Sequence, residues 1–238
     1  MKVLSIISLS LIVLISCGQS GRKEINKQTH KPELISPQEN LTDTLFNFEK
    51  YEPGIAPKNW TQYYTGRGES TEWKILQEDG NSALTQVSND HPNFHFNVII
   101  HNSLVAKNVD LQVKLKGLSG EMDQGGGFVW RFIDANNYYV VRANPLEDNV
   151  VMYKVKNGKR TDLPVIGKGR SYGVDVKPLG SGWNTLRLVA QNDIFTVFLN
   201  NEEIFKVKDK TFTSAGKLGL WTKADAVTAF DDFKIVIK

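Results

Sequence analysis

The stretch Val109-Asp110-Leu111-Gln112-Val113-Lys114-Leu115-Lys116 decides the fold class. Apolar and polar side chains alternate along it without interruption. Successive side chains of a β-strand point to opposite faces of the sheet. This alternation is therefore typical of a strand with one face on a core and the other in water. The stretch predicts an amphipathic β-strand.

Similar runs, rich in β-branched and aromatic residues, occupy 128–133, 138–143, 150–155, 172–176, 183–190, 194–199, 204–207, 217–222 and 227–237. Turn-forming residues such as Asn157-Gly158 and Asn200-Asn201 separate them. No window beyond the N-terminal region carries the apolar stripe of a helix. Short strands at this spacing predict an all-β fold, an antiparallel β-sandwich or jelly roll. We expect residues 43–238 to form it as a single domain.

The composition excludes several classes of protein. The 238 residues are 40% hydrophobic and 10% aromatic, which is too apolar for a disordered chain. The net charge of +3 is too small to predict nucleic-acid binding. The single cysteine, Cys17, excludes an intrachain disulfide framework and a cysteine-cluster metal site.

The N-terminus has the pattern of a secretory signal. A basic start at Lys2 precedes an apolar run from Leu4 to Ile15, which is too short to span a membrane. Leu14-Ile15-Ser16-Cys17 resembles the bacterial lipobox, in which cleavage before the cysteine is followed by lipidation of its thiol. We expect a signal peptide at 1–16, lipidation of Cys17 and a flexible tether at 17–42. The alternative is an ordinary signal peptide with a chance cysteine. A lipid anchor would place the protein in the bacterial cell envelope, at the outer membrane or cell surface.

The central hairpin allows its two faces to be assigned. With 134–137 as the loop, Phe132 would oppose Tyr139, Trp130 would oppose Val141, and Phe128 would oppose Ala143. That apolar face should pack into the core. We expect the other face to be exposed and to carry Val129, Arg131, Ile133, Tyr138, Val140, Arg142, Val151, Tyr153 and Val155. A register slip of one residue would exchange the two faces.

Several segments carry a family resemblance: Gly125–Phe132, Asn136–Asn144, Gly182–Arg187, Asn200–Glu202, Gly219–Lys223 and Phe230–Phe233. They resemble concanavalin A-like, laminin G-like bacterial domains, especially the group known as 3-keto-disaccharide hydrolase-like. The resemblance covers roughly residues 45–238 and implies a sandwich fold. Because this superfamily includes lectins, binding modules and glycan-cleaving enzymes, the fold alone does not choose an activity.

The loop from Asn144 to Asn149 adjoins the face with the arginines and tyrosines. A sugar site needs hydrogen-bonding groups for hydroxyls beside an aromatic ring. The candidate ligand-binding residues are Arg131, Tyr138, Arg142, Asn144, Glu147, Asp148 and Tyr153. Glu147 and Asp148 are also candidate catalytic acids, although glycosidase carboxylates must flank one bond at a distance of about 5–10 Å. The alternative is a polar hairpin turn with arginines at a sheet edge.

A cation site is a second possibility. Asp231 lies on the last strand and Glu49 near the first, and these strands are often neighbours in jelly rolls. Carboxylate oxygens suit Ca²⁺, so Glu49 and Asp231 are candidate calcium ligands. The alternative is a pair of solvated turn acids.

Three functions remain open from the sequence. The first is a membrane-anchored lipoprotein whose sandwich binds a carbohydrate or oligosaccharide. The second, implied by the resemblance, is a glycoside-processing enzyme of the 3-keto-disaccharide hydrolase type. The third is a structural or protein-binding sandwich. The folded domain carries a net charge of only about +1, which suits a neutral sugar.

Overall fold

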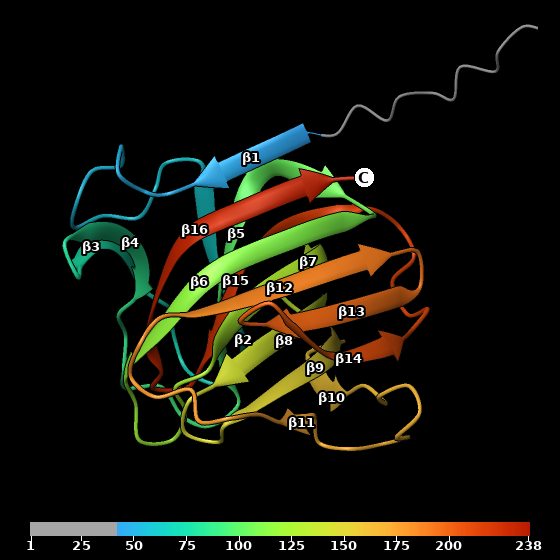
Figure 1. The fold of residues 1–238 in the computed structure, drawn as a ribbon. Helices are drawn as coiled ribbons and strands as arrows, with labels where there is room; N and C mark the ends of the chain where they lie inside the picture. Colours follow the sequence, from blue (N-terminus) through green and yellow to red (C-terminus); the bar gives the residue numbers. More distant parts are fainter. Residues whose placement is uncertain (1–41) are drawn as a thin grey trace, which may run out of the picture. The chain divides into compact units, whose positions relative to one another are not determined.

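The computed structural model describes residues 42–238, and the predictions for the signal, the lipidated cysteine and the tether lie outside this range. The described chain forms two antiparallel sheets (Figure 1). One, the β16 sheet, has the order β14-β13-β12-β6-β16-β4-β3, with β1 pairing with β16. Its strands are β1 (Thr42–Phe46), β3 (Trp73–Glu78), β4 (Asn81–Gln86), β6 (Val109–Ser119), β12 (Asn184–Gln191), β13 (Ile194–Leu199), β14 (Glu202–Lys208) and β16 (Val227–Ile237).

The other sheet, the β8 sheet, has the order β10-β9-β8-β7-β15-β5-β2, with β11 pairing with β9. Its strands are β2 (Trp60–Gly66), β5 (His95–Ala106), β7 (Gly126–Asp134), β8 (Asn137–Asn144), β9 (Asn149–Lys156), β10 (Lys159–Asp162), β11 (Val174–Asp175) and β15 (Gly216–Lys223). The predicted all-β sandwich is confirmed. No helix in the described part of the chain is long and apolar enough to span a membrane.

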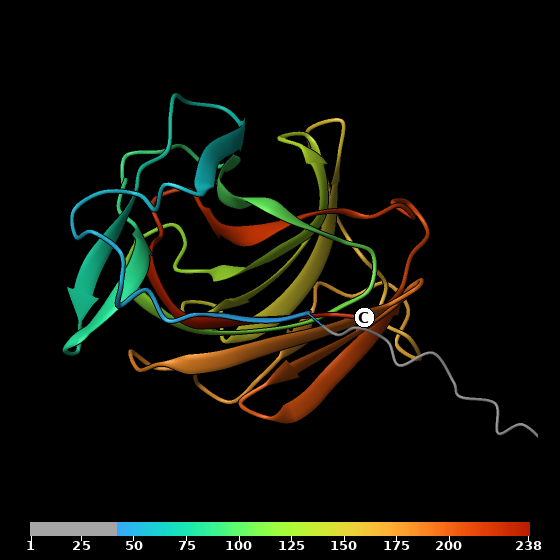
Figure 2. The same cartoon turned by 90° about the horizontal axis from the view of Figure 1, so that it is seen from above.

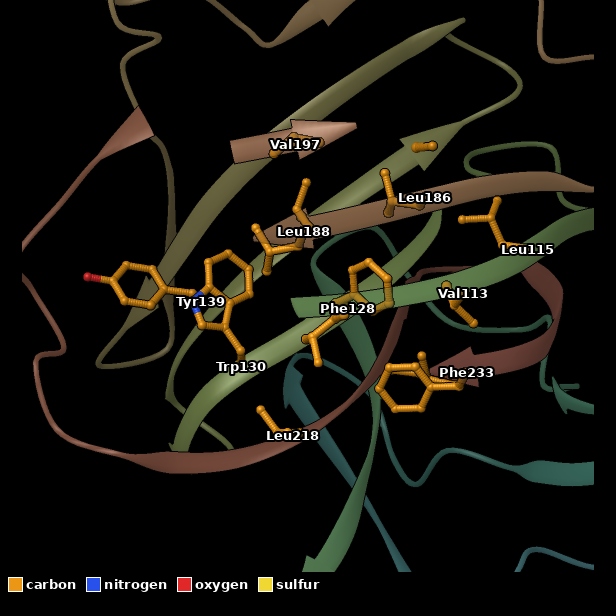
Figure 3. Close-up of a cluster of buried hydrophobic side chains, with 14 of the residues drawn as sticks. Val113, Leu115, Phe128, Trp130, Tyr139, Leu186, Leu188, Val197, Leu218 and Phe233 are labelled. Carbon is orange, nitrogen blue, oxygen red and sulfur yellow. The ribbon is translucent and has the colours of Figure 1, made fainter. Parts of the chain in front are cut away.

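The main core fills the space between the two sheets. Alternate residues of β6, including Val113 and Leu115, meet Phe128 and Trp130 of β7 there (Figure 3). The Trp130 ring stacks on Tyr139 at 5.2 Å between centroids. Burial of these large side chains is the main source of stability in a sandwich of this kind.

The β7–β8 hairpin contains a bulge that the simple alternation does not show. Its register pairs Phe128 with Val141 and Trp130 with Tyr139, and it shifts between Trp130 and Asp134. Arg131 sits at the shift with φ of +47°, in the left-handed region. The predicted pairing is therefore wrong by two residues beyond the bulge, because three residues of β7 lie between Trp130 and Asp134 while only one residue of β8 lies between their partners Tyr139 and Asn137.

The bulge also moves side chains between the two faces of the sheet. Phe132, predicted in the main core, lies on the opposite face with Tyr138. Arg131, predicted beside Tyr138, instead leaves that face, and Ile133 is exposed to solvent. The remaining assignments hold on both faces, since the alternation is unbroken on either side of the bulge.

The β8 sheet curls, so its outer face is concave (Figure 2). Thr65 of β2 and Tyr138 of β8 are joined by a hydrogen bond of 2.8 Å between their hydroxyl groups. Four strand-to-strand steps separate β2 from β8 in the order of the sheet. In a flat sheet these steps would span about 19 Å. The curl brings the edge strand β2 and the inner strand β8 together across the concave face.

The predicted exposure of this face is consequently wrong, because a second apolar cluster fills it. The cluster comprises Phe96, Val98, Ile100, Val129, Phe132, Tyr138, Val140, Val151, Tyr153, Val155 and Trp221. All of these side chains are buried.

Candidate functional site

A row of guanidinium groups and aromatic rings crosses the concave face. Arg160 of β10 has its Cζ 4.4 Å from the ring centroid of Tyr153 and 5.0 Å from that of Phe96. Arg142 of β8 lies 6.0 Å from the Tyr153 ring and 5.9 Å from the Tyr172 ring. These are cation–π distances. We call Phe96, Arg160, Tyr153, Arg142 and Tyr172 the Arg–aromatic row.

Arg142 is the centre of a hydrogen-bonded network at one end of this row. Only 1% of the residue is exposed. Its Nη1 donates to both oxygens of Asn149, the backbone one at 3.2 Å. Its Nη2 donates to Glu147 Oε2 at 2.7 Å and to the hydroxyls of Tyr153 and Tyr172 at 3.3 and 3.4 Å. A buried guanidinium needs such partners, and together they fix its position.

Glu147 connects the network to solvent, with 35% of its side chain exposed. Its Oε2 also accepts a hydrogen bond of 3.0 Å from Asn149 Nδ2. Burial acts to raise the pKa of Glu147, but the charge of Arg142 and these hydrogen bonds outweigh it and lower the pKa below its ordinary value. Glu147 is thus held ionised, as a hydrogen-bond acceptor.

The neighbouring candidates Asp148 and Asn144 shape the loop. Asp148 Oδ1 accepts a hydrogen bond of 2.9 Å from the backbone N–H of Leu179, and its φ is +46°. Asn144 Oδ1 accepts from the backbone N–H groups of Gln124 and Leu146 at 3.3 and 3.1 Å. The carboxylate of Asp148 therefore binds a different partner from that of Glu147. The catalytic role of these two acids stays a prediction.

A buried ion pair lies next to the network. Lys223 Nζ is 2.9 Å from Asp123 Oδ2, and both side chains are almost fully covered. Asp225 accepts hydrogen bonds from the backbone N–H groups of residues 121–123, which fixes the loop that carries Asp123. The charges of Asp123 and Lys223 act on Arg142 and Glu147 respectively, so this end of the concave face holds four alternating charges.

Two residues of the network, Asn149 and Tyr172, are absent from the candidates that the sequence predicts. The sequence predicts a strand that begins at Tyr172, but the only strand described in that segment is β11, two residues further on. Tyr172 reaches the network from the loop before β11, with 53% of the residue exposed and its hydroxyl 2.9 Å from that of Tyr153. The glycines on either side, at 169 and 173, mark a loop and were the available signal.

Two predicted ligand contacts lie elsewhere. Tyr138 shares the concave face but sits at its opposite end, bonded to Thr65. Arg131 lies away from this face, where it donates to the backbone carbonyls of Lys107, Phe212 and Asn192. The prediction that Arg131 joins the site is wrong in its geometry, because the bulge in β7 turns the side chain away.

The proposed calcium ligands are close to each other. Burial, together with the nearby charges of Asp232 and Glu49, raises the pKa of Asp231. Glu49 Oε1 accepts a hydrogen bond of 2.8 Å from the backbone N–H of Ser82. No cluster of three or more His, Cys, Asp or Glu suited to a metal occurs in residues 42–238. The calcium site stays a prediction.

The fold is similar to that of several solved structures. No family model matches the chain, and no curated protein matches its sequence. Carbohydrate binding module CBM66 from Bacillus subtilis is similar in structure, with a TM-score of 0.56 and 18% identity, over 74% of this chain and 93% of that one. A galectin-like protein of unknown function from Bacillus subtilis has a TM-score of 0.50 and 11% identity, over 76% and 91% of the two chains.

A third similar structure is the GH43 protein BlXynB from Bacillus licheniformis. Its TM-score is 0.52 at 13% identity, and the match covers 88% of this chain but 41% of that one. At these identities the likeness concerns the fold alone. The chain has the concanavalin A-like jelly-roll sandwich that its sequence resembles.

Proposed function

We propose that this protein is a carbohydrate-binding β-sandwich whose ligand site is the exposed end of the Arg–aromatic row. The observation that carries the proposal is the position of Tyr172, an exposed ring held beside the ionised carboxylate of Glu147 and the guanidinium of Arg142. A sugar presents an apolar ring face and a rim of hydroxyls. An aromatic ring next to fixed hydrogen-bonding groups complements both.

The polar groups of the site are held in place by their own hydrogen bonds. Arg142 is buried and bonded to Glu147, Asn149 and both tyrosines, so the groups around Tyr172 have little freedom to lose. Preorganisation of this kind reduces the entropic cost of binding. The similarity of the fold to a carbohydrate binding module supports the same function, although it concerns the fold alone.

The ionised state of the Glu147 carboxylate favours a binding function over hydrolysis. A glycosidase acid must carry a proton near neutral pH, which requires a raised pKa. The pKa of Glu147 is lowered instead, and its Oε2 already accepts hydrogen bonds from Arg142 and Asn149. The carboxylate is suited to accept a hydrogen bond from a sugar hydroxyl.

We also propose that the protein is a lipoprotein of the cell envelope, tethered through Cys17 to a membrane. The lipobox-like sequence before this single cysteine supports the proposal. Two or more acyl chains on one residue are sufficient for stable anchoring. The sandwich would then meet glycans outside the cytoplasm.

The binding function is tested with the purified full-length protein on an array of neutral and acidic oligosaccharides. The Tyr172→Ala variant should bind the best ligand at least about tenfold more weakly, while Tyr172→Phe keeps the ring and most of the affinity. Tyr64→Ala is the matched control, since Tyr64 is 40% exposed and packs against His95 on the other face of its strand. Absence of binding to every glycan would overturn the proposal.

Two further measurements separate the alternatives. Turnover of a 3-keto-disaccharide, followed by released reducing sugar, would favour the enzyme over the binding module. For the anchor, Cys17→Ser should move the protein from the membrane fraction to the soluble fraction. Continued membrane association of that variant would contradict lipid anchoring.

A further inference from the structure

The opposite end of the concave face contains a groove that is distinct from the site at Tyr172. It has a volume of about 530 Å³, within the range of small-molecule sites. It lies between the end of β2 and the β9–β10 turn. Its lining residues are Gly66, Arg67, Phe94, Phe96, Asn136, Asn157, Gly158, Lys159 and Arg160.

The groove is cationic. Three of its lining residues, Arg67, Lys159 and Arg160, are basic and none is acidic. Within the described chain, these three make no ion pair with a carboxylate. The other arginines of residues 42–238 all bond to protein oxygens, Arg131 to backbone carbonyls and Arg142, Arg170 and Arg187 to acids. The guanidinium groups without an oxygen partner in the described structure are thus the two that line this groove.

Arg160 is held in place without using its N–H groups. Its guanidinium stacks over the rings of Tyr153 and Phe96, at 4.4 and 5.0 Å from their centroids. Stacking fixes the plane of the guanidinium and leaves its edge available. That edge is a fork with the geometry to bind a carboxylate, sulfate or phosphate group in a bidentate manner.

An exposed aromatic ring stands beside these cations. Phe94 is 56% exposed, and its φ of +68° is unusual for a bulky residue. A Cβ on Gly66, at the end of β2, would lie 1.8 Å from the carbonyl oxygen of Phe94, so only glycine permits this close approach of the two segments. Strained residues of this kind concentrate at binding sites. The turn presents a phenyl ring to solvent in a groove that also carries the amides of Asn136 and Asn157.

We infer that this groove binds an acidic saccharide, with the anionic group on Arg67 and Arg160 and the apolar face of the sugar on Phe94. The inference rests on the proposed function for the class of ligand, and it adds the charge of that ligand and a second contact site. The carboxylate of a uronic acid and a sulfate ester share the required chemistry. The local charge of the groove, rather than the net charge of the domain, favours an acidic ligand at this place.

The test compares four probes by titration calorimetry on the full-length protein: oligogalacturonate, sulfated dextran, neutral dextran and a single-stranded oligonucleotide of similar charge. One or both acidic glycans should bind, with an affinity that falls as salt increases. Arg67→Gln and Lys159→Gln should each weaken that binding, Arg67→Gln by at least about tenfold. Both side chains are exposed and unbonded in the described structure, so neither substitution should impair folding.

Arg170→Gln is the matched control, because Arg170 is also exposed and lies outside the groove. Binding of neutral dextran as tight as that of the acidic glycans would overturn the inference and leave the proposed function intact. Equal binding of the oligonucleotide, or acidic-glycan binding unchanged in Arg67→Gln, would also overturn it. Failure of all the glycans, here and on the array, would refute the proposed function itself.

Discussion

The hydroxyl of Thr65 lies 2.8 Å from that of Tyr138, although their strands are four steps apart in the same sheet. Thr65 also donates to the backbone carbonyl of Ala135 in the β7–β8 loop. These bonds join the edge strand β2 to the β7–β8 hairpin across the concave face. They close one end of the face beside Gly66 and Asn136, which line the groove at Phe94.

We expect Tyr138→Phe to lower the free energy of unfolding by about 1 kcal/mol, since it removes one buried hydrogen bond and keeps the ring. Thr65→Val should cost more, because it also removes the hydrogen bond to the backbone carbonyl of Ala135. The double variant should cost less than the sum of the two, because both remove the same bond. Denaturant unfolding of all three variants measures this. Strict additivity would show that the hydroxyls do not interact.

Among the polar clusters, we expect substitutions in the Arg142 network to lower the free energy of unfolding most. Arg142→Met leaves Glu147 and Asn149 without their buried partner and should cost about 3–5 kcal/mol. Arg170→Met is the control, with 71% of its side chain exposed, and should change stability by less than about 0.5 kcal/mol. Denaturant midpoints compare the two. A small effect of Arg142→Met would show that the network is not coupled to folding.

A substitution of Gly127 tests how closely the backbones of β7 and β8 approach each other. A Cβ there would lie 1.9 Å from the carbonyl oxygen of Val141, so Gly127→Ala should destabilise the protein by about 1–3 kcal/mol. Gly182 has open space around it and an ordinary φ, so Gly182→Ala should be neutral or slightly stabilising. Thermal unfolding of both variants provides the comparison. Equal effects would contradict the close approach.

The carboxylate of Asp225 should contribute a pH-dependent part of the stability. Burial would raise its pKa, but the backbone N–H groups of Met122, Glu121 and Asp123 lower it below its ordinary value of 3.8. The folded state therefore binds the proton less tightly than the unfolded state. Its contribution is fully present above the unfolded pKa of about 3.9 and disappears as the pH falls through the lower folded pKa.

Asp225→Asn should consequently lower stability at pH 7 by about 1.5–3 kcal/mol and reduce the loss of stability on acidification below about pH 4. Glu69→Gln is the control, because Glu69 is exposed to solvent. The free energy of unfolding, measured from pH 7 to pH 2, checks both the lower stability at pH 7 and the smaller loss of stability in acid. An unchanged pH profile in Asp225→Asn would refute the role of this carboxylate.

Calcium binding by Glu49 and Asp231 can be tested by measuring thermal stability with and without Ca²⁺. If both carboxylates hold the ion, added Ca²⁺ should raise the Tm of the wild-type protein, and a chelator should reverse the change. Asp231→Asn should abolish the response. A Tm that does not depend on Ca²⁺ in the wild-type protein would remove this site.

The alternation of side chains was sufficient to predict the sandwich and the faces of β6, β8 and β9. Strand periodicity is a local property, because each side chain's direction follows from the previous one. Arg142 and Tyr153 were placed on one face for this reason, and the structure bonds them to each other. The Asn144–Asn149 loop was correctly associated with that face, since a short hairpin turn keeps its ends together.

The register and the burial of the concave face required the tertiary structure. The bulge at Arg131 depends on a single residue adopting a left-handed conformation, and no alternation pattern marks it. The curl of the β8 sheet brings large side chains of several strands together, which converts a face predicted to be exposed into a second core. The contacts of Tyr172 with Arg142 and Tyr153 depend on a loop that returns over β9.

The sequence by itself therefore determined the fold class, the strand faces and a candidate loop, because these follow from spacing along the chain. Only the tertiary structure decided which polar residues meet, which arginines keep a free edge, and where the concave face stays open. Those properties depend on distances between strands that are far apart in sequence. The Thr65–Tyr138 contact and the pair Arg67 and Arg160 in the Phe94 groove are the clearest examples.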